Sequence, residues 1–556
     1  MTATPPFATP VPASAAGPDP APADREGSAT DRLARPLVLL SHRGPVGFSR
    51  SGDERTASRG SGGLVTALVG LAEHLDEAVW VCAASGAEDE AVAGEAGGQA
   101  VTVVTSTPPH LAAPDEQVDT GSALQVRMVP VVPELHEPFY TVVSNPLLWF
   151  VQHGLYGQAD APVITADDHA AIEAYATVNE QFAGVVCEEV EARGGAALVM
   201  IQDYHFYLVA EHVRKRCPRA LLSHFVHIPW PGPDAWRILP PPVRNRFVRG
   251  LLGSDVVGFH TARYARNFAY CVQEMLGLEV DMTDLSVEVD GRRVLIRHYP
   301  ISVDPAALDS VLGSELAVGH RARLYEEFVA PLWTAGADAG ADEHQPERQL
   351  IVRVDRTDPS KNVVRGFLAF GTLLDQHPEL IGRLSFLALL QPSRTDVPEY
   401  ATYLASIGAA VTQINGRHTT GGRQPIDLQL VEDFPLAVAA YSVCDVLMVN
   451  ALADGMNLVA KEVPVVSRRN SVLALSETTG AYEELGEHAV TLYPFDIQQT
   501  ADALYAALTM DPDERRRRRE AAARQIREHD VAAWLDRQLV DLEALDPGPT
   551  PPRSPA

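Results

Sequence analysis

The sequence predicts an α/β fold made of two Rossmann-like, doubly wound domains that face each other across a cleft. The chain has 556 residues, which is too long for one compact domain. Short apolar runs alternate with stretches of helical period, a pattern typical of parallel sheets covered by helices. A polar, glycine-rich break at 335–348 separates two such series.

The elements are predicted from this alternation in chain order. Residues 1–35 and 546–556 have a composition that cannot bury a core, so we expect disorder there. Buried strands are expected at 37–41, 196–201, 221–226, 350–354, 384–390, 446–449 and 472–475. The predicted domains span 36–310 and 311–510, and a C-terminal helix at 511–545 is expected to pack back toward the first domain. The arginine run at 515–519 is interpreted as a solvated helix face.

Charge and composition exclude several classes of protein. Acidic residues outnumber basic residues by 73 to 45, and the net charge of −28 disfavours binding to nucleic acid or to an anionic membrane. No apolar run reaches the ~18 residues of a membrane span, and no secretory signal opens the sequence. The 5 cysteines are scattered without metal-binding spacing, so we expect reduced thiols in a cytoplasmic protein without a metal site.

The first candidate motif follows the strand at 37–41. That strand leads to Arg43, and a glycine-rich turn containing Gly62 and Gly63 then opens a predicted helix. Glycines at a helix start let backbone N–H groups approach a phosphate, and the helix dipole favours negative charge there. A glycine-rich turn alone is more often a simple turn without a ligand, so a phosphate-binding role here depends on support from the other motifs.

Polar side chains follow two further strands. Asp203 comes after the strand at 196–201, and His227 follows the strand at 221–226. Ligands of doubly wound sheets bind at the carboxyl ends of the strands. We therefore interpret the pair as part of a site, although a single histidine would more often be structural.

Two cations follow the strand at 350–354. Arg356 and Lys361 lie at a strand-to-helix junction, where two cations can stabilise a departing diphosphate. The chain has only three lysines, Lys215, Lys361 and Lys461, so finding one here argues against a plain surface role.

The segment 454–462 combines Asp454, a glycine and a helix start whose first N–H groups are free for a phosphate. Glu462 lies one helical turn after Leu458, on the same face. Its carboxylate can accept hydrogen bonds from both hydroxyls of a sugar diol. Lys461 has no evident chemical role and is expected to pair with Glu462 on the helix.

At these places together the sequence resembles the trehalose-6-phosphate synthases, which are retaining glycosyltransferases of family 20 with the GT-B architecture. The resemblance runs from about residue 37 to residue 545. It is carried by DYH at 203–205, HIPWP at 227–231, DVVGFHT at 255–261, YPISVDP at 299–305, RTDPSK at 356–361, QPSRTDV at 391–397, DGMNLVAKE at 454–462 and HDVAAW at 529–534. The segment DGMNLVAKE is highly specific by itself.

The resemblance implies a role for each candidate residue. On the donor side, Arg356 and Lys361 would hold the diphosphate, with Gly62 and Gly63 near the same phosphates. The remaining donor contacts would be Asp454 and His227 to the sugar, Glu462 to the ribose, and the main chain of Asn457, Leu458 and Val459. On the acceptor side, Arg43 and Arg394 would clamp a phosphate, and the pocket would be lined by Tyr140, Trp149 and Asp203.

The reaction implied is transfer of glucose from a nucleotide-glucose to glucose 6-phosphate, giving α,α-trehalose 6-phosphate. The first domain would bind the acceptor and the second the nucleotide sugar. Front-face retention needs no protein nucleophile, so the protein would position groups and stabilise charge, without a cofactor. The expected partners are the two substrates, not nucleic acid or a membrane, and a homo-oligomer is compatible with the sequence.

The sequence departs from the family pattern at four places. Asn362 replaces the usual glycine after the lysine, Pro359 replaces an aromatic residue, Ala84 replaces a tryptophan, and 450–453 read Asn-Ala-Leu-Ala instead of Thr-Pro-Leu-Arg. These changes resemble an actinomycete branch that includes GDP-glucose-dependent synthases, so GDP-glucose is the expected donor. They also resemble pseudo-glycosyltransferases that couple a GDP-cyclitol to an aminocyclitol phosphate. That alternative stays open, as does a non-catalytic sugar-phosphate sensor.

Overall fold

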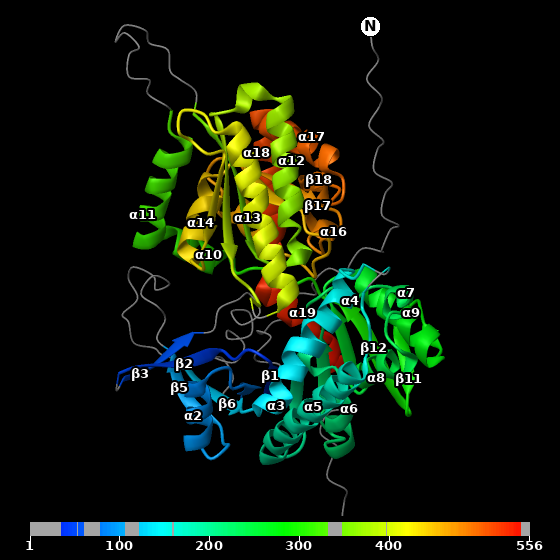
Figure 1. Cartoon of the computed structure of the whole chain (residues 1–556). Helices are drawn as coiled ribbons and strands as arrows, with labels where there is room; N and C mark the ends of the chain where they lie inside the picture. Colours follow the sequence, from blue (N-terminus) through cyan, green and yellow to red (C-terminus); the bar gives the residue numbers. More distant parts are fainter. Residues whose placement is uncertain are drawn as a thin grey trace, which may run out of the picture.

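In the computed structural model the chain folds into two α/β domains, each built on its own sheet (Figure 1). The structure describes residues 35–52, 54–59, 78–105, 122–157, 159, 161–331, 347–395 and 397–545. Disorder was predicted for 1–35 and 546–556 and a loop for 335–348. Apart from Arg35 and residues 347 and 348, these segments lie outside the described residues. None of the described helices has the length and apolar character that crossing a membrane requires.

Ten strands form the sheet of the first domain, in the order β10-β11-β12-β9-β8-β7-β1-β4-β6-β5. Its centre is parallel, with β1 (Leu37–Ser41) between β4 (Val79–Ala83) and β7 (Leu198–Gln202). The other strands are β5 (Val101–Thr105), β6 (Ser122–Val129), β8 (Leu221–Phe225), β9 (Val256–Phe259), β10 (Val280–Asp281), β11 (Ser286–Val289) and β12 (Arg292–His298). Alternate residues of β1 pack into two different apolar clusters, so this sheet is covered on both faces.

Helices supply that cover. The longest is α5 (Ala166–Ala192), which begins at a capping box in which Thr165 and Asp168 exchange hydrogen bonds. The other helical segments of this domain are α2 (Ala87–Glu95), α3 (Pro133–Glu137), η2 (Pro138–Leu148), α4 (Trp149–His153), η3 (Tyr204–Phe206), α6 (Val209–Arg216), α7 (Pro233–Trp236), α8 (Pro241–Leu251) and α9 (Ala262–Leu276). A hairpin of β2 (Val46–Ser51) and β3 (Glu54–Arg59) forms a separate two-stranded sheet.

Six parallel strands form the sheet of the second domain, in the order β15-β14-β13-β16-β17-β18. Counted from its first strand, this is the order 3-2-1-4-5-6 of the Rossmann fold. The strands are β13 (Gln349–Arg356), β14 (Leu384–Gln391), β15 (Ile426–Leu430), β16 (Val446–Val449), β17 (Val472–Ser476) and β18 (Val490–Leu492). The helical segments are α10 (Pro305–Gly313), α11 (Glu315–Leu324), η4 (Tyr325–Val329), η5 (Pro359–Lys361), α12 (Val363–Gln376), η6 (Pro378–Leu380), α13 (Pro398–His418), α14 (Phe434–Val443), α15 (Val459–Val466), α16 (Tyr482–Leu485), η7 (Gly486–His488) and α17 (Ile497–Leu508).

The predicted fold class is confirmed, and each of the predicted strands is present with its ends displaced by at most 2 residues. The apolar pattern did not single out the remaining strands, which are β2, β3, β4, β5, β6, β9, β10, β11, β12, β15 and β18. Of these, β15 and β18 are edge strands whose side chains are only partly buried, so their composition carries a weaker signal.

The C-terminal segment forms two helices where one was predicted. The first, α18 (Pro512–Glu528), ends at His529, which leaves helical geometry with φ −122° and ψ 60°. The carboxylate of Asp530 then accepts the N–H of Ala533 at 3.0 Å and caps α19 (Val531–Leu545). In α19, Trp534 lies 5.4 Å from the ring of Phe225, so this helix packs on the first domain.

The arginine run at the start of α18 is only partly solvated. Arg516 and Arg517 are exposed, as predicted. Arg515 instead donates to the carbonyl of Asp445 at 3.0 Å, and Arg518 donates to the carbonyl of Ala489 at 2.9 Å. The prediction was wrong for these two because they follow helical spacing and turn toward the second domain.

Candidate active site

The carboxyl ends of the parallel strands of both sheets meet where the two domains touch, and we call this region the junction. These ends lead to Arg43, Asp203 and His227 in the first domain and to Arg356, Arg394 and Asp454 in the second. Two of the hydrogen bonds that cross the junction run from Tyr264 Oη to the carbonyl of Asp454, at 3.0 Å, and from Arg394 Nη2 to Tyr204 Oη, at 3.1 Å. The strand ends of both sheets therefore share one region.

Gly455 determines how closely the domains approach there. A Cβ at Gly455 would lie 1.8 Å from the carbonyl oxygen of His227. A Cβ at Gly480 would lie 1.9 Å from the carbonyl oxygen of Gly455. Because neither backbone contact leaves room for a side chain, glycine at these positions allows the loop after β16 to lie against the backbone of His227.

Lys361 and Asp454 form an ion pair on the second-domain side of the junction. Lys361 Nζ donates to Asp454 Oδ2, and Asn457 Nδ2 donates to the same oxygen at 3.0 Å. Burial disfavours the charged form of Asp454, but the Lys361 ammonium outweighs it and lowers the pKa of Asp454. The pair therefore holds a charged lysine next to the strand ends.

The start of α15 presents backbone donors to the same region. Asn457 has a φ of 76°, a left-handed conformation that asparagine tolerates, and its Oδ1 accepts the N–H of Ala460 at 3.1 Å. The N–H groups of Lys461 and Glu462 bond to the carbonyl of Leu458. By helix geometry the donors left over are those at Leu458, the N-cap of α15, and at Val459, its first residue.

The carboxyl group of Glu462 lies one turn further along α15. Burial raises the pKa of Glu462 to about 7, although a hydrogen bond with the Tyr441 hydroxyl opposes this. Tyr441 lies on α14 and is itself buried. The charge of Glu462 therefore changes near neutral pH.

Arg394 is held by acceptors from both domains. Its Nη1 donates to Asp358 Oδ2 at 3.2 Å and to the Tyr400 hydroxyl, and its Nη2 reaches Tyr204. The Tyr400 hydroxyl also donates to Asp358 at 3.0 Å. Three buried oxygen-bearing side chains thus fix the guanidinium beside the junction.

Trp149 lies under both guanidinium groups of this region. The centroid of its ring is 4.2 Å from the guanidinium carbon of Arg394 and 5.2 Å from that of Arg356. Its Nε1 donates to Asp358 Oδ1 at 3.3 Å. Burial opposes ionisation of Asp358, but Arg356 and Arg394 outweigh it and lower its pKa to about 2.

A stack of rings in the first domain lies beside Arg43. The ring of His42 is 4.5 Å from that of His205 and 4.9 Å from that of Tyr140. Burial, with His136 and Arg43 nearby, lowers the pKa of His42 to about 3, and burial also lowers the pKa of His205 far below its usual value. Both imidazoles are therefore neutral at physiological pH, while the side chain of Arg43 is exposed.

His227 and Asp203 are joined through the backbone. The main-chain N–H of His227 donates to Asp203 Oδ1 at 3.2 Å, and its Nε2 lies 2.9 Å from Gln202 Oε1. Burial lowers the pKa of His227 well below its usual value and raises that of Asp203 to about 7. Asp203 has a φ of 72°, which is uncommon for a residue other than glycine and arises at the sharp turn after β7.

Lys461 does not pair with Glu462. Its Nζ forms an ion pair with Glu484 Oε2 at 2.5 Å and donates to the carbonyl of Ile301 at 2.8 Å, and the side chain is 2% exposed. The prediction was wrong because adjacent residues of a helix point in different directions. Since Ile301 follows β12, this buried lysine ties α15 to the end of the first domain.

Two of the departures from the family pattern contact each other. Asn362 has a φ of 56°, a left-handed conformation that suits glycine or asparagine. Asn362 Nδ2 donates to the carbonyl of Asn450 at 3.0 Å, and Asn450 Nδ2 donates to the carbonyl of Asn362 at 3.0 Å. The asparagines thus connect the loops that follow β13 and β16.

The structure brings most of the predicted residues to the junction, while Gly62 and Gly63 lie outside the described residues. Sequence reasoning missed five side chains of this region, which are His42, Tyr204, His205, Asp358 and Tyr400. Four of the five directly precede or follow a predicted residue or stand within a quoted motif. Tyr400 lies on α13 and has no such signal.

The model of glycosyltransferase family 20 matches residues 35–544 of this chain. Among curated relatives, α,α-trehalose-phosphate synthase (UDP-forming) 2 of Aspergillus niger is 30% identical over 511 residues, which is 90% of this chain and 95% of the relative. The bifunctional trehalose-6-phosphate synthase/phosphatase of Thermoproteus tenax is 33% identical over 512 residues, 90% of this chain and 62% of the relative. Synthase 1 (UDP-forming) of Arabidopsis thaliana is 30% identical, over 91% of this chain and 49% of the relative. This chain therefore spans only about half to two thirds of the latter two.

Solved structures agree with the fold. An α,α-trehalose-phosphate synthase (UDP-forming) from Burkholderia vietnamiensis is similar with a TM-score of 0.71 and 26% identity, over 92% of this chain and 100% of that chain. An E. coli structure bound with UDP-2-fluoro glucose is similar in fold with a TM-score of 0.73 and 24% identity, over 91% of this chain and 98% of that chain. Because the family model covers nearly the whole chain, this protein belongs to glycosyltransferase family 20, and its two facing parallel sheets are those of the GT-B fold.

Proposed function

We propose that this protein is an α,α-trehalose-phosphate synthase that transfers glucose from a nucleotide-glucose to glucose 6-phosphate. The observation that carries the proposal is the presence of two groups of cations at one junction. Arg356 and Lys361 lie on the second-domain side, and Arg43 and Arg394 can meet a second anion. A reaction between two anionic substrates, one with a diphosphate and one with a phosphate monoester, requires a separate group of cations for each. Membership of family 20 and the names of the relatives support it.

The donor is proposed to bind to the second domain. Its diphosphate would take Lys361 and Arg356, together with the free N–H groups at the start of α15. Glu462 would accept the ribose hydroxyls, and Asp454 and His227 would contact the sugar. The further donor contacts assigned on the resemblance are Gly62, Gly63, Asn457, Leu458 and Val459.

The acceptor is proposed to bind against the first domain. Its phosphate would lie between Arg43 and Arg394, whose guanidinium groups can each donate two parallel hydrogen bonds to a phosphate. Tyr140, Trp149 and Asp203 would line the pocket around the sugar. Because the rings stacked beside Arg43 are neutral, the two arginines would be the groups that neutralise the phosphate charge.

The proposed chemistry proceeds on one face of the sugar. The bond between the anomeric carbon and the diphosphate oxygen breaks, and the acceptor hydroxyl oxygen bonds to the same face of that carbon. The acceptor proton passes to the departing diphosphate. Lys361 then stabilises the charge that develops on the leaving group, which is a role for a fixed cation in a partly buried site.

For the donor base we propose guanine. The support is the resemblance at 359, 362 and 450–453 to a branch with GDP-glucose-dependent members, whereas the relatives above are named UDP-forming. The deciding experiment offers UDP-, GDP- and ADP-glucose in turn with glucose 6-phosphate and identifies the product by mass. Trehalose 6-phosphate made fastest from GDP-glucose supports both parts. If trehalose 6-phosphate forms from UDP-glucose alone, the proposal of a guanine base is wrong. If it forms with none of the donors, the proposed synthase activity is wrong.

A further inference from the structure

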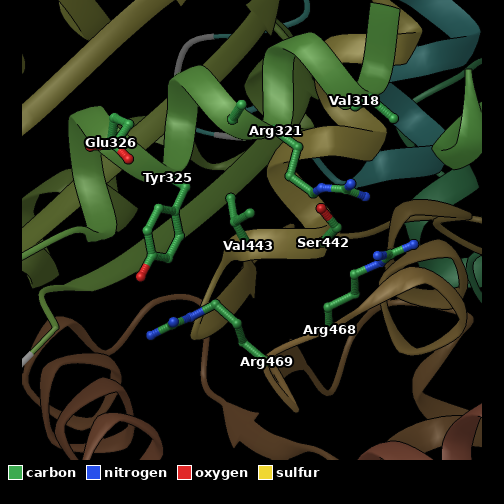
Figure 2. A pocket seen from close by; sticks show the side chains of 9 residues that line it. Val318, Arg321, Tyr325, Glu326, Ser442, Val443, Arg468 and Arg469 are labelled. Carbon is green, nitrogen blue, oxygen red and sulfur yellow. The ribbon is translucent and has the colours of Figure 1, made fainter. Parts of the chain in front are cut away.

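A second cationic site lies on the second domain, at the end of the sheet away from the junction (Figure 2). It is a pocket of about 460 Å³ between α11 and η4 on one side and the end of α14 and the loop from α15 to β17 on the other. The end of α14 leads into β16, and the loop leads into β17. The pocket therefore lies at the amino ends of these strands, away from the junction.

Two arginines of this pocket have no anionic partner among the described side chains. Arg321 Nη1 is buried and makes no hydrogen bond. Arg468 is exposed, and no described carboxylate pairs with it. Figure 2 shows their side chains extending toward the same side of the pocket. Burial and the charge of Arg468 both lower the pKa of Arg321, which places the two guanidinium groups within electrostatic reach of each other.

The neighbouring Arg469 differs from both because carboxylates pair with its charge. It pairs with Glu347 at 2.5 Å and with Asp445 at 3.1 Å. In Figure 2 it points away from Arg321 and Arg468. The carboxylate that does line the pocket, Glu326, is turned away from both guanidinium groups in the same view. The pairing that neutralises Arg469 therefore does not extend to the other two.

This arrangement is unfavourable without a ligand. A buried donor that lacks an acceptor destabilises the fold, and two adjacent cations repel each other. An anion between Arg321 and Arg468 removes both penalties at once. A phosphate suits the position because each guanidinium can bind it with two parallel hydrogen bonds. The chain has a net charge of −28, which repels anions in general. Binding of an anion in this pocket would therefore depend on the two arginines.

We propose that this pocket is a second anion-binding site that takes a small phosphorylated molecule, with the phosphate between Arg321 and Arg468. Its volume falls within the roughly 300–1,000 Å³ of small-molecule sites. That space exceeds what a free phosphate fills, and Val318, Ala322 and Tyr325 provide a surface for the rest of the ligand. The site is separate from the proposed synthase reaction and stands or falls without it.

Crystals of the full chain soaked in sodium selenate test the position of the anion. Selenate is a tetrahedral dianion like phosphate, and its selenium is located by anomalous scattering. We expect a peak within hydrogen-bonding distance of both Arg321 and Arg468. Peaks confined to the junction, or to other surface arginines, would overturn the proposal.

Calorimetric titration of the full chain tests the arginines in solution. We expect Arg468→Gln and Arg321→Gln each to weaken the binding of inorganic phosphate at this site about tenfold. Arg323→Gln is the matched control, because Arg323 is an exposed arginine of α11 that does not line the pocket. Arg468 is exposed and repels Arg321, so its replacement should not lower the unfolding temperature without phosphate. Equal phosphate binding by wild type, Arg468→Gln and Arg323→Gln would contradict the site.

Glucose 6-phosphate and uncharged glucose complete the titration. The signal of interest is the binding lost in Arg468→Gln, which separates the pocket from the junction. A larger loss with glucose 6-phosphate than with inorganic phosphate supports a phosphorylated organic ligand. Equal losses would overturn the proposed contact with the rest of the ligand, and a loss with uncharged glucose would overturn recognition through phosphate.

Discussion

The two sides of the junction differ in how they hold their polar groups. On the first-domain side, burial keeps the imidazoles of His42, His205 and His227 neutral. On the second-domain side, Lys361 is paired with Asp454 and keeps the pKa of that carboxyl low despite its burial. The first side therefore supplies shape and neutral hydrogen-bonding groups around one exposed cation, Arg43, whereas the second supplies most of the fixed charge. If the proposed function is correct, replacing a charged residue that meets the donor diphosphate should impair the chemical step, and replacing a residue that meets the acceptor should impair acceptor binding.

The largest effect is expected for Lys361→Ala. The ammonium would stabilise charge that appears only as the diphosphate leaves, so its loss should lower kcat by ~10³-fold while the protein stays folded. The matched control is Lys215→Ala, since Lys215 lies on the surface with its side chain 66% exposed. Steady-state kinetics and the unfolding temperature of both variants decide the matter. Turnover of Lys361→Ala within a few-fold of wild type would show that the proposed site is wrong.

A smaller effect, on a different constant, is expected for Arg394→Ala. This arginine is proposed to bind the acceptor phosphate, so KM for glucose 6-phosphate should rise ~10- to 100-fold with little change in KM for the donor. Arg417→Ala provides the control, because Arg417 is half exposed and lies on α13 away from the strand ends. Initial rates at varied concentrations of each substrate separate the two constants. An effect confined to the donor would contradict the division between the two sides.

The charged side was easier to predict from the sequence than the neutral side. Arg356, Lys361 and Asp454 each lie just after a strand, in short segments whose charges are uncommon near buried strands, so local sequence identifies them. The ring stack assembles His42, Tyr140 and His205 from three distant segments. No local pattern contains such a contact, because the sheet order β7-β1 creates it.

The fold itself was predicted well for most of the buried parallel strands, although β4 and β9 were missed, and poorly elsewhere. Strands such as β1 and β16 are buried along their whole length and consist almost entirely of apolar residues, so they stand out in the sequence. The break between α18 and α19 depends on one capping aspartate, Asp530, inside a continuous helical period. Likewise, the partner of Lys461 is a carbonyl 160 positions away, which no spacing rule reveals.

A smaller effect, dependent on pH, is expected from Glu462. Its pKa of about 7 means that lowering the pH through 7 adds a proton to a carboxylate that is proposed to accept the ribose hydroxyls. The kcat/KM for the donor should then fall about tenfold per unit once the pH is well below 7. In Glu462→Gln this fall should disappear, with kcat/KM reduced at higher pH. If the variant keeps the wild-type pH profile, the titrating group is another, such as Asp203, whose pKa is also raised to about 7.

The smallest effect concerns stability and tests whether the two departures at 362 and 450 act together. Asn362→Gly keeps the left-handed backbone permitted but removes the amide that donates to the carbonyls of Asn450 and Pro494, so it should cost ~1–2 kcal/mol and lower the unfolding temperature by a few degrees. Asn450→Thr should cost a similar amount, because it removes the reciprocal bond. Asn470→Gly is the matched control, since Asn470 also has a positive φ, of 53°, without such reciprocal bonds. Because the two bonds brace the same pair of loops, the double variant should lose less than the two single losses together. Strictly additive losses would mean that the loops after β13 and β16 are fixed independently, and that the charged side of the junction does not depend on this pair for its rigidity.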